Sequence, residues 1–379
     1  MSNRVLIPAG AGVAILAAAA IAVVFRSGDG GEPPTAIARA EHDGMVRGTV
    51  WVANEDGASL TAIDAARNEV LTTLTGIEGP HNLQASPDGR SVWAVSGHES
   101  QAVMVDAADF SLHGAVATGK EPAHVVVTPD GRTVYTTNGA DDTVSAIDVA
   151  TMKQVATVPV GPFPHGLRPS PDGRWVYVAN AKGTTVSVID TVKNARVADI
   201  EVGKAPVQIA FSPDGRFAYA SLNGENAVAK IDVARRTLVT HAMVGVGPIQ
   251  TYVSPDGRYL LVANQGTEKR PSTTVSIVET ASFKVVGTVE TGRGAHGVVV
   301  DPSSRHAYVT NIYGGEVAVL DLAQRKVVAR IPVGEKPNGI SFSPVVPSVR
   351  PARSMRLPLR HDAEESEHSS DETHEMDEG

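Results

Sequence analysis

Residues 170–180 read SPDGRWVYVAN, and the return of this pattern along the chain decides the fold. The five-residue start of the pattern, [ST]-P-D-G-R, recurs every 42 residues, at Ser86, Thr128, Ser170, Ser212 and Ser254. A degenerate copy, DPSSR, begins at Asp301, and a last copy begins at Ser343. A fixed period of about 40 residues indicates a repeat protein in which each unit is one supersecondary element.

Each repeat contains four short runs rich in Val, Ile and Tyr, separated by turns of Gly, Asp, Asn and Pro. In the unit that follows Pro164 the runs are HGLRPS, WVYVAN, TVSVID and RVADIEVG. Four such strands in about 40 residues are typical of one propeller blade. The second run returns seven times, as TVWVAN, SVWAVS, TVYTTN, WVYVAN, FAYASL, YLLVAN and HAYVTN. The sequence therefore predicts an all-β, seven-bladed propeller with four-stranded blades over residues 46–344.

The two ends of the repeat array complement each other. The first unit, from Val46, lacks a first strand, whereas residues 337–343 form a first strand with no unit to follow. We expect this C-terminal strand to pair into the first blade, because closing the ring buries both faces of every sheet and removes a free edge. A closed ring of this kind predicts a monomer.

The motifs also carry a family resemblance. The segments YVAN, LVAN and YVTN, followed by TVSVID and VVxxIxVG, resemble the YVTN-family β-propeller repeat over residues 46–344. The resemblance implies the fold and leaves the function open, since propellers of this type resemble ligand-binding, surface and scaffold proteins and lactonases. They also resemble the propeller domains of nitrous-oxide reductase and of haem-containing nitrite reductase.

Composition excludes several kinds of site. The chain has no cysteine, so it can form neither disulfides nor thiolate metal sites. Residues 361–379 hold nine of the 42 acidic residues and no Lys or Arg, so the remaining acids equal the 33 basic residues. The folded part is therefore neutral, with no global basic footprint for nucleic acid.

Both termini differ from the repeats. Residues 5–25 contain no charge and are long enough to span a bilayer. We predict a hydrophobic signal anchor at residues 1–26, or alternatively a cleaved signal peptide, and a flexible tether at 27–45. The protein is then extracytoplasmic, at the membrane or secreted. Residues 345–379 are Pro- and Arg-rich and then acidic with histidines, so we expect disorder there, with weak sequestration of divalent metal as an alternative role.

Most recurrent polar residues have a structural explanation. The Asp-Gly pair of the repeated motif forms a tight turn, and the acid that ends the third run caps the turn after it. The Asn that ends most copies of the second run is likewise interpreted as a turn former. These positions are not expected to form active sites.

One position in each blade varies in a way that the fold does not require. The start of each first strand carries an imidazole or a carboxamide, at His81, His124, His165, Gln208, Gln250, His296 and Asn338. One interpretation is that these side chains cap the chain as it enters the strand. The other is that they converge at the channel mouth on a small polar ligand or a protein partner. They could also hold a divalent transition metal or a metallocofactor, with imidazole ligands from His81, His124, His165 and His296.

Other features are expected on the same face. They are His98, the enlarged loop Gln265–Thr273, and the basic residues Lys120, Lys204, Arg293 and Lys336.

The chain lacks the nucleophile-elbow, zincin and Walker motifs. The sequence therefore favours a propeller that binds a ligand or partner without catalysis. The alternatives are a lactonase-like hydrolase and a metal- or metallocofactor-binding propeller.

Overall fold

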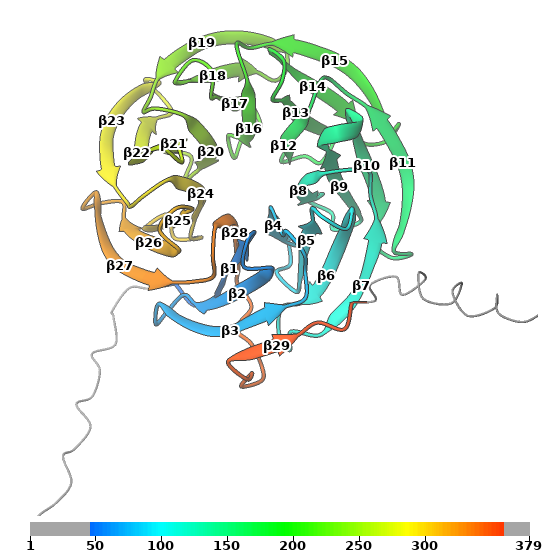
Figure 1. Cartoon of the computed structure of the whole chain (residues 1–379). Helices are drawn as coiled ribbons and strands as arrows, with labels where there is room; N and C mark the ends of the chain where they lie inside the picture. The colour runs from blue at the N-terminus through cyan, green and yellow to red at the C-terminus, as the bar shows by residue number, and fades with distance from the viewer. Residues whose placement is uncertain (1–45, 360–379) are drawn as a thin grey trace, which may run out of the picture. The chain divides into compact units, whose positions relative to one another are not determined.

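The computed structural model describes residues 46–359, which form a seven-bladed β-propeller (Figure 1). Every blade contains four antiparallel strands, of which the first lies nearest the axis and the fourth lies at the rim. We number the blades in chain order and call the first strand of each blade its inner strand. The predicted fold class and blade number are confirmed.

The strands follow the repeats closely. Blades 1 to 3 contain β1 (Thr49–Asn54), β2 (Ser59–Asp64), β3 (Glu69–Thr75), β4 (Leu83–Ala85), β5 (Ser91–Ser96), β6 (Gln101–Asp106), β7 (Leu112–Ala117), β8 (Pro122–Val127), β9 (Thr133–Asn138), the 3-10 turn η1 (Gly139–Asp141), β10 (Thr143–Asp148) and β11 (Lys153–Pro159). Blades 4 and 5 contain β12 (Pro164–Pro169), β13 (Trp175–Asn180), β14 (Thr185–Asp190), β15 (Ala195–Glu201), β16 (Pro206–Phe211), β17 (Phe217–Leu222), β18 (Ala227–Asp232) and β19 (Thr237–Met243). Blades 6 and 7 contain β20 (Pro248–Val253), β21 (Tyr259–Thr267), β22 (Arg270–Glu279), β23 (Lys284–Glu290), β24 (Ala295–Val300), β25 (His306–Asn311), β26 (Glu316–Asp321) and β27 (Lys326–Pro332).

The ring closes as the sequence predicts. Strand β28 (Pro337–Ser343) pairs antiparallel with β1, so that Thr49 faces Ser343 and Val50 faces Phe342. The inner strand of blade 1 therefore comes from the C-terminal end of the repeats, and β1 has a hydrogen-bonded neighbour on both sides.

The expectation of disorder after residue 344 is wrong for residues 345–359. Strand β29 (Ser354–Arg356) pairs parallel with β3 and adds a fifth strand to blade 1. Leu357 is only 4% exposed and joins the cluster around Trp51, which Met355 and Leu359 also contact. The segment is ordered because its spaced apolar side chains reach that cluster while its backbone pairs with the open edge of β3.

The remaining terminal predictions lie outside the described residues. These are the hydrophobic signal anchor at 1–26, the tether at 27–45 and the acidic tail at 361–379. Within residues 46–359, no helix has the length and apolar character needed to cross a membrane.

The core lies between neighbouring blades. The third residue of each second strand is a large side chain with at most 1% exposure, at Trp51, Trp93, Tyr135, Tyr177, Tyr219, Leu261 and Tyr308. Each of these packs in an apolar cluster, as Trp51 does against Phe110 of blade 2, at 5.6 Å between ring centroids. A single sheet could not bury such residues on both faces, so each blade depends on its neighbours.

The repeated turn between first and second strands is structural, as predicted. In blade 2 the Ser86 hydroxyl donates to Asp88 Oδ1 at 2.6 Å, and the Arg90 amide donates to the same oxygen at 3.0 Å. These donors lower the pKa of Asp88, the Ser86 hydroxyl most strongly, against a smaller opposing effect of burial. Gly89 adopts φ +73°, a conformation that other residues rarely adopt.

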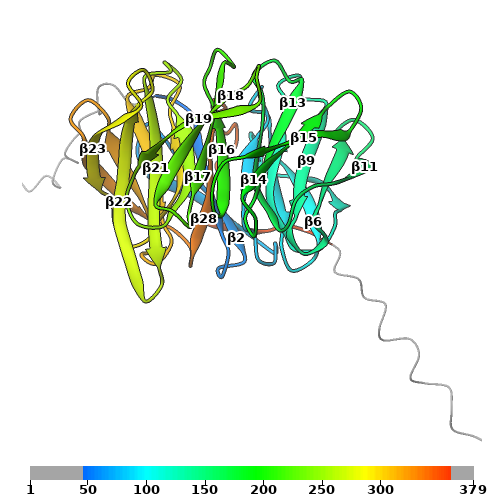
Figure 2. The ribbon, with the colours of Figure 1, turned by 90° about the horizontal axis from the view of Figure 1, so that it is seen from above.

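The segment Gln265–Thr273, expected to be a loop, is mostly strand. Residues inserted in this repeat lengthen both β21 and β22, which continue to pair at Gly266 with Pro271 and at Thr267 with Arg270. The hairpin extends beyond those of the other blades (Figure 2). The insertion forms strand because its residues continue the backbone hydrogen bonding between β21 and β22.

Candidate functional site

The seven predicted residues stand at the same end of the inner strands. His81 lies just before β4, whereas His165, His296 and Asn338 are the second residues of their strands. His124, Gln208 and Gln250 are the third residues of theirs. The pairing register shifts at this point in these strands except β4, and such bulges re-aim side chains. Residues one position apart in the repeat thus reach the same part of the channel.

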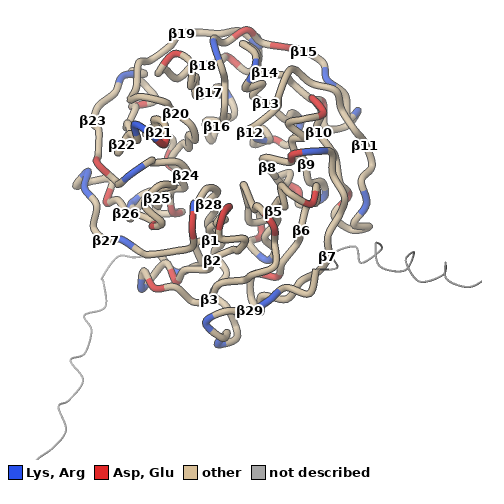
Figure 3. Tube along the Cα trace, viewed as in Figure 1, with Lys and Arg blue, Asp and Glu red and all other residues tan. Residues whose placement is uncertain are grey.

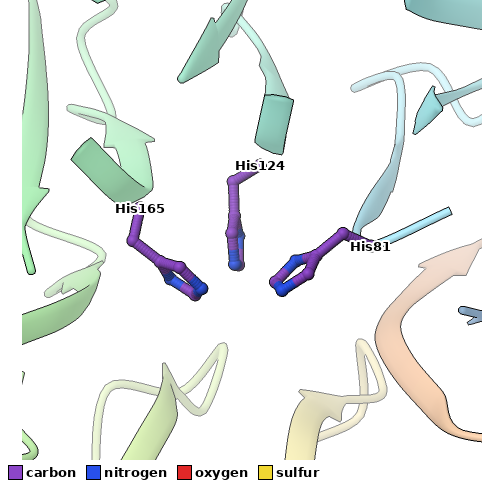
Figure 4. Close-up of side chains that lie close together, drawn as sticks. All are labelled: His81, His124 and His165. Atoms are coloured by element: carbon purple, nitrogen blue, oxygen red, sulfur yellow. The ribbon is translucent and has the colours of Figure 1, made fainter. Parts of the chain in front are cut away.

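Four histidine rings are gathered there. The ring centroids of His124 and His165 are 4.7 Å apart, and His81 lies 5.1 Å from His165 and 5.5 Å from His124. These three side chains point toward one another (Figure 4), and one ring nitrogen of each lies within 4.8 Å of the others. The His296 ring lies farther away, at 6.4 Å from His81.

The hydrogen bonds of three histidines determine their tautomers. Nδ1 of His81, His165 and His296 lies 3.1, 3.1 and 3.2 Å from a backbone carbonyl oxygen. In each case that carbonyl belongs to the residue 42 positions later, on the next blade around the ring. A carbonyl only accepts, so Nδ1 carries the proton and Nε2 keeps a free lone pair when the ring is neutral. Histidines that bind metals are usually oriented in this way.

His124 is held differently. Its Nδ1 lies 3.3 Å from Gln208 Nε2, and Gln208 Oε1 accepts the Ile209 amide at 2.9 Å. An amide nitrogen only donates, so Nδ1 of His124 accepts and Nε2 carries the proton. That Nε2 is buried and has no hydrogen-bond partner among residues 46–359. Coordination through it would require the Gln208 amide to turn so that its oxygen faces Nδ1.

The four rings are uncharged at neutral pH. Burial lowers the pKa of His165 to about 3, and the neighbouring His81 adds to the effect. Burial also lowers the pKa of His81, His124 and His296. Neighbouring histidines add to the lowering at His124 and His296, and Lys336 adds a smaller lowering at His81 and His296. For His81, Glu55 opposes part of this shift. Neutral imidazoles are the form that binds metal, so no ring has to lose a net proton near pH 7, although at His124 the proton on Nε2 has to shift to Nδ1.

Sequence reasoning missed a carboxylate beside this cluster. Asn338 Nδ2 donates to Glu55 Oε2 at 2.6 Å, and Lys336 Nζ lies 3.3 Å from Glu55 Oε1. Burial alone would raise the pKa of Glu55, but His81, Asn338 and Lys336 together lower it. Glu55 directly follows the Asn that ends β1, and it is the only acid at that repeat position. An acid at a position where no other repeat has one was the sequence feature that could have identified Glu55.

Glycines let the neighbouring blades approach the ring. A glycine directly follows three of the seven residues. A Cβ at Gly166 would collide with Gln208 Oε1 and the backbone beside it, and a Cβ at Gly297 would lie 2.5 Å from the Asn338 carbonyl oxygen. Since only glycine fits, these positions set how closely the inner strands pack at the mouth.

The other expected residues lie around this face without joining the cluster. His98 is exposed and packs over Gly79 in the loop that leads to His81. Lys336 contacts Glu55 and Asp56, whereas Gln265 donates to the Tyr313 hydroxyl at 2.8 Å. Within residues 46–359, no ring contact joins His98 to the four histidines.

Comparisons with known proteins agree with the fold. The family model described as YNCE-like beta-propeller matches residues 12–305. Hydrazine synthase from Kuenenia stuttgartiensis is 26% identical, with a TM-score of 0.64, over 72% of this chain and 91% of that chain. A putative 6-phosphogluconolactonase from Bacteroides fragilis is 18% identical, with a TM-score of 0.66, over 78% of this chain and 98% of that chain.

A further similar structure is dihydro-heme d1 dehydrogenase NirN in complex with DHE. It is 17% identical, with a TM-score of 0.58, over 77% of this chain and 74% of that chain. At such identity, the likeness to this dehydrogenase and to the lactonase supports the fold alone. No curated protein sequence matches the chain.

Proposed function

Since the chain belongs to the YNCE-like β-propeller family, whose description specifies a fold and no reaction, we propose a function from the site itself. The propeller binds one transition-metal ion at the mouth of its central channel, between His81, His124 and His165. This proposal takes up the metal-binding alternative that the sequence left open beside the favoured binding of a ligand or protein partner. It rests on one observation: three imidazoles from consecutive blades present ring nitrogens within 4.8 Å of one another.

Two changes are needed for the three rings to coordinate an ion: the Gln208 amide turns to free Nε2 of His124, and the rings move closer together. At metal–nitrogen distances of about 2.1 Å, two imidazole nitrogens on a tetrahedral ion lie about 3.4 Å apart. The rings therefore have to close by at most about 1.4 Å, which side-chain rotation can supply. His81 and His165 already donate through Nδ1 to backbone carbonyls, which orients the opposite nitrogen for binding.

The ligand type predicts which metals bind. Imidazole suits Cu²⁺, Zn²⁺ and Ni²⁺, whereas Mg²⁺ and Ca²⁺ require oxygen ligands. The affinity should follow the usual order for divalent ions, with Cu²⁺ tighter than Ni²⁺ or Zn²⁺. Glu55 lies beside His81 but is paired with Lys336, so the two charges offset each other at this mouth.

Metal titration of the full chain, purified without a polyhistidine tag and stripped with a chelator, tests the proposal. The terminal segment carries its own histidines, so the parent protein for the test replaces His361, His368 and His374 with Gln. We expect one Cu²⁺ or Zn²⁺ per chain by calorimetry and elemental analysis. The double variant His81→Ala/His165→Ala should lose it.

A matched control removes two histidines elsewhere. His113 and His241 lie exposed on the outer strands β7 and β19, so His113→Ala/His241→Ala should retain full stoichiometry. Circular dichroism establishes that each variant is folded. Unchanged stoichiometry in the His81→Ala/His165→Ala variant would refute the proposal.

We also propose an extracytoplasmic location, because residues 5–25 form an uncharged hydrophobic stretch. Fractionation of cells that make the full chain would test this location.

A further inference from the structure

The inner strands carry one charged residue among them. Of all the residues in β4, β8, β12, β16, β20, β24 and β28, Arg168 of β12 is the only Asp, Glu, Lys or Arg. Figure 3 shows how charged residues lie mainly on the outer strands and the loops instead. At the same repeat position as Arg168 the other blades have Gln84, Val126, Ala210, Tyr252, Val299 and Ser341. The channel therefore has a single cation at this level.

Arg168 has no carboxylate partner within the described residues. Its Nη1 donates to Gln84 Oε1 at 3.2 Å, and no ion pair involves it. Burial lowers the pKa of its guanidinium, while Tyr252 opposes the shift. A guanidinium nevertheless stays charged in proteins. Arg168 is half-buried, and a charge partly removed from water without an opposite charge is costly, so this position favours an anion beside it.

A cavity of about 380 Å³ adjoins this side chain. It is lined by Arg168, Gln84, Gln250 and Tyr252, together with apolar residues such as Val299. Prolines that follow the inner strands also line it: Pro87, Pro255 and Pro302 in turns between first and second strands, and Pro344 directly after β28. The cavity thus reaches the end of the channel opposite the histidine mouth, and Gln250 contributes to both.

Besides Asn82, Ser86 and Ser341, three polar side chains of the lining offer hydrogen-bond donors to a ligand, namely Arg168, Gln250 and Tyr252. Gln250 is only 3% exposed, and its Nε2 has no hydrogen-bond partner in the described part of the chain. Tyr252 adds a hydroxyl whose pKa is raised by burial, so it remains a donor at neutral pH. Of the residues that the structure describes, no Asp or Glu lines the cavity. A guanidinium, an unpaired amide N–H and a phenol around one partly open cavity suit a ligand that accepts hydrogen bonds.

We propose that this cavity binds a small carboxylate or oxyanion, held by the Arg168 guanidinium with Gln250 and Tyr252 as further donors. The planar fork of arginine matches two oxygens of such an anion and gives stronger, charge-assisted hydrogen bonds. The proposal does not rest on the metal site. The two sites are electrostatic neighbours, because the charge of Arg168 contributes to the low pKa of His124.

Anion titrations of the metal-free full chain test this site. The probes are sodium acetate, nitrate, sulfate and phosphate, each added at constant ionic strength against sodium chloride in the presence of a chelator. We expect at least one of them to bind with a stoichiometry of one per chain and to raise the melting temperature. Acetate or nitrate as the best ligand would indicate a planar anion, whereas sulfate or phosphate would indicate a tetrahedral one.

Substitutions then locate the binding. Arg168→Gln should weaken it about tenfold or more, as expected for loss of a charged hydrogen-bonding group, whereas Arg132→Gln, on an exposed turn, should leave it unchanged. Gln250→Leu keeps the charge and removes the amide donor, so it should weaken binding in a folded protein even if Arg168→Gln does not fold. The His81→Ala/His165→Ala variant should bind the anion as the parent does.

Three results would overturn the proposal. They are no oxyanion binding beyond that of chloride, equal affinity in the parent, Arg168→Gln and Gln250→Leu proteins, or loss of anion binding in the His81→Ala/His165→Ala variant. The last result would assign the anion to the histidine mouth. Failure of metal binding alone leaves the anion measurement intact, so the two proposals fail separately.

Discussion

Acidification should destabilise the propeller through its histidine mouth, and His165 allows the size of this effect to be worked out. Its pKa is lowered from 6.5 to about 3, mainly by burial. The unfolded chain takes up this proton near pH 6.5, whereas the folded protein does so only near pH 3. The contribution of the neutral ring to stability is therefore complete above pH 6.5 and is lost as the pH falls toward 3.

The expected loss is large enough to measure. Between about pH 7.5 and about pH 5, these two pKa values imply that His165 alone removes about 2 kcal/mol of unfolding free energy. This is an upper value because the ring is partly exposed to the channel. The pKa values of His81, His124 and His296 are shifted in the same direction, so their effects add to the loss.

Denaturant titrations at about pH 7.5 and about pH 5 measure this loss of unfolding free energy. A chelator is present so that bound metal does not add to the stability. Wild type is compared with His165→Gln, which has no titrating ring and should lose about 2 kcal/mol less over the interval. His241→Gln, on the outer strand β19, serves as the matched exposed variant and should behave as wild type. If wild type and His165→Gln lose the same free energy, the reasoning about a neutral, buried ring is refuted.

Three further predictions concern packing. Leu357→Ala should lower the unfolding free energy by about 2–4 kcal/mol, because the side chain is buried in the core, and denaturant titration measures it. Gly166→Ala should cost about 1–3 kcal/mol, because its Cβ would collide with Gln208, whereas Gly314→Ala makes only ordinary contacts and should cost less. Asn180→Ala removes two hydrogen bonds, of 2.9 and 3.0 Å, to hydroxyls of strand β14 and should cost about 1–3 kcal/mol in the same assay.

The fold was predictable almost to the residue because the repeat length fixes the register. The spare strand expected at residues 337–343 coincides with β28, which pairs with β1. Strand β29 was not predicted, because Pro and Arg dominate its segment and hide the apolar residues that reach the core. The amino-acid composition describes the average polarity of the segment, whereas its packing against blade 1 depends on a few side chains such as Leu357.

The sequence predicts which residues form the site, but it does not predict the distances between their side chains. One imidazole or carboxamide per blade could be read from the repeat, but the choice of His81, His124 and His165 as the closest group depends on side-chain orientation. Tautomers follow from carbonyls on the next blade, and no sequence pattern reveals those distances. Arg168 was equally visible as an exception at its repeat position, yet its significance depends on which position faces the axis.

The closure of blade 1 also sets the order in which the protein can be completed during synthesis. Strands β1 to β3 emerge from the ribosome first, but their sheet gains β28 and β29 only from the last described part of the chain. The edge of β1 that β28 later covers stays open while six other blades are made. A nascent chain of this protein thus carries an unpaired, apolar edge for most of its translation, and a chaperone that shields it has a defined target in residues 49–54.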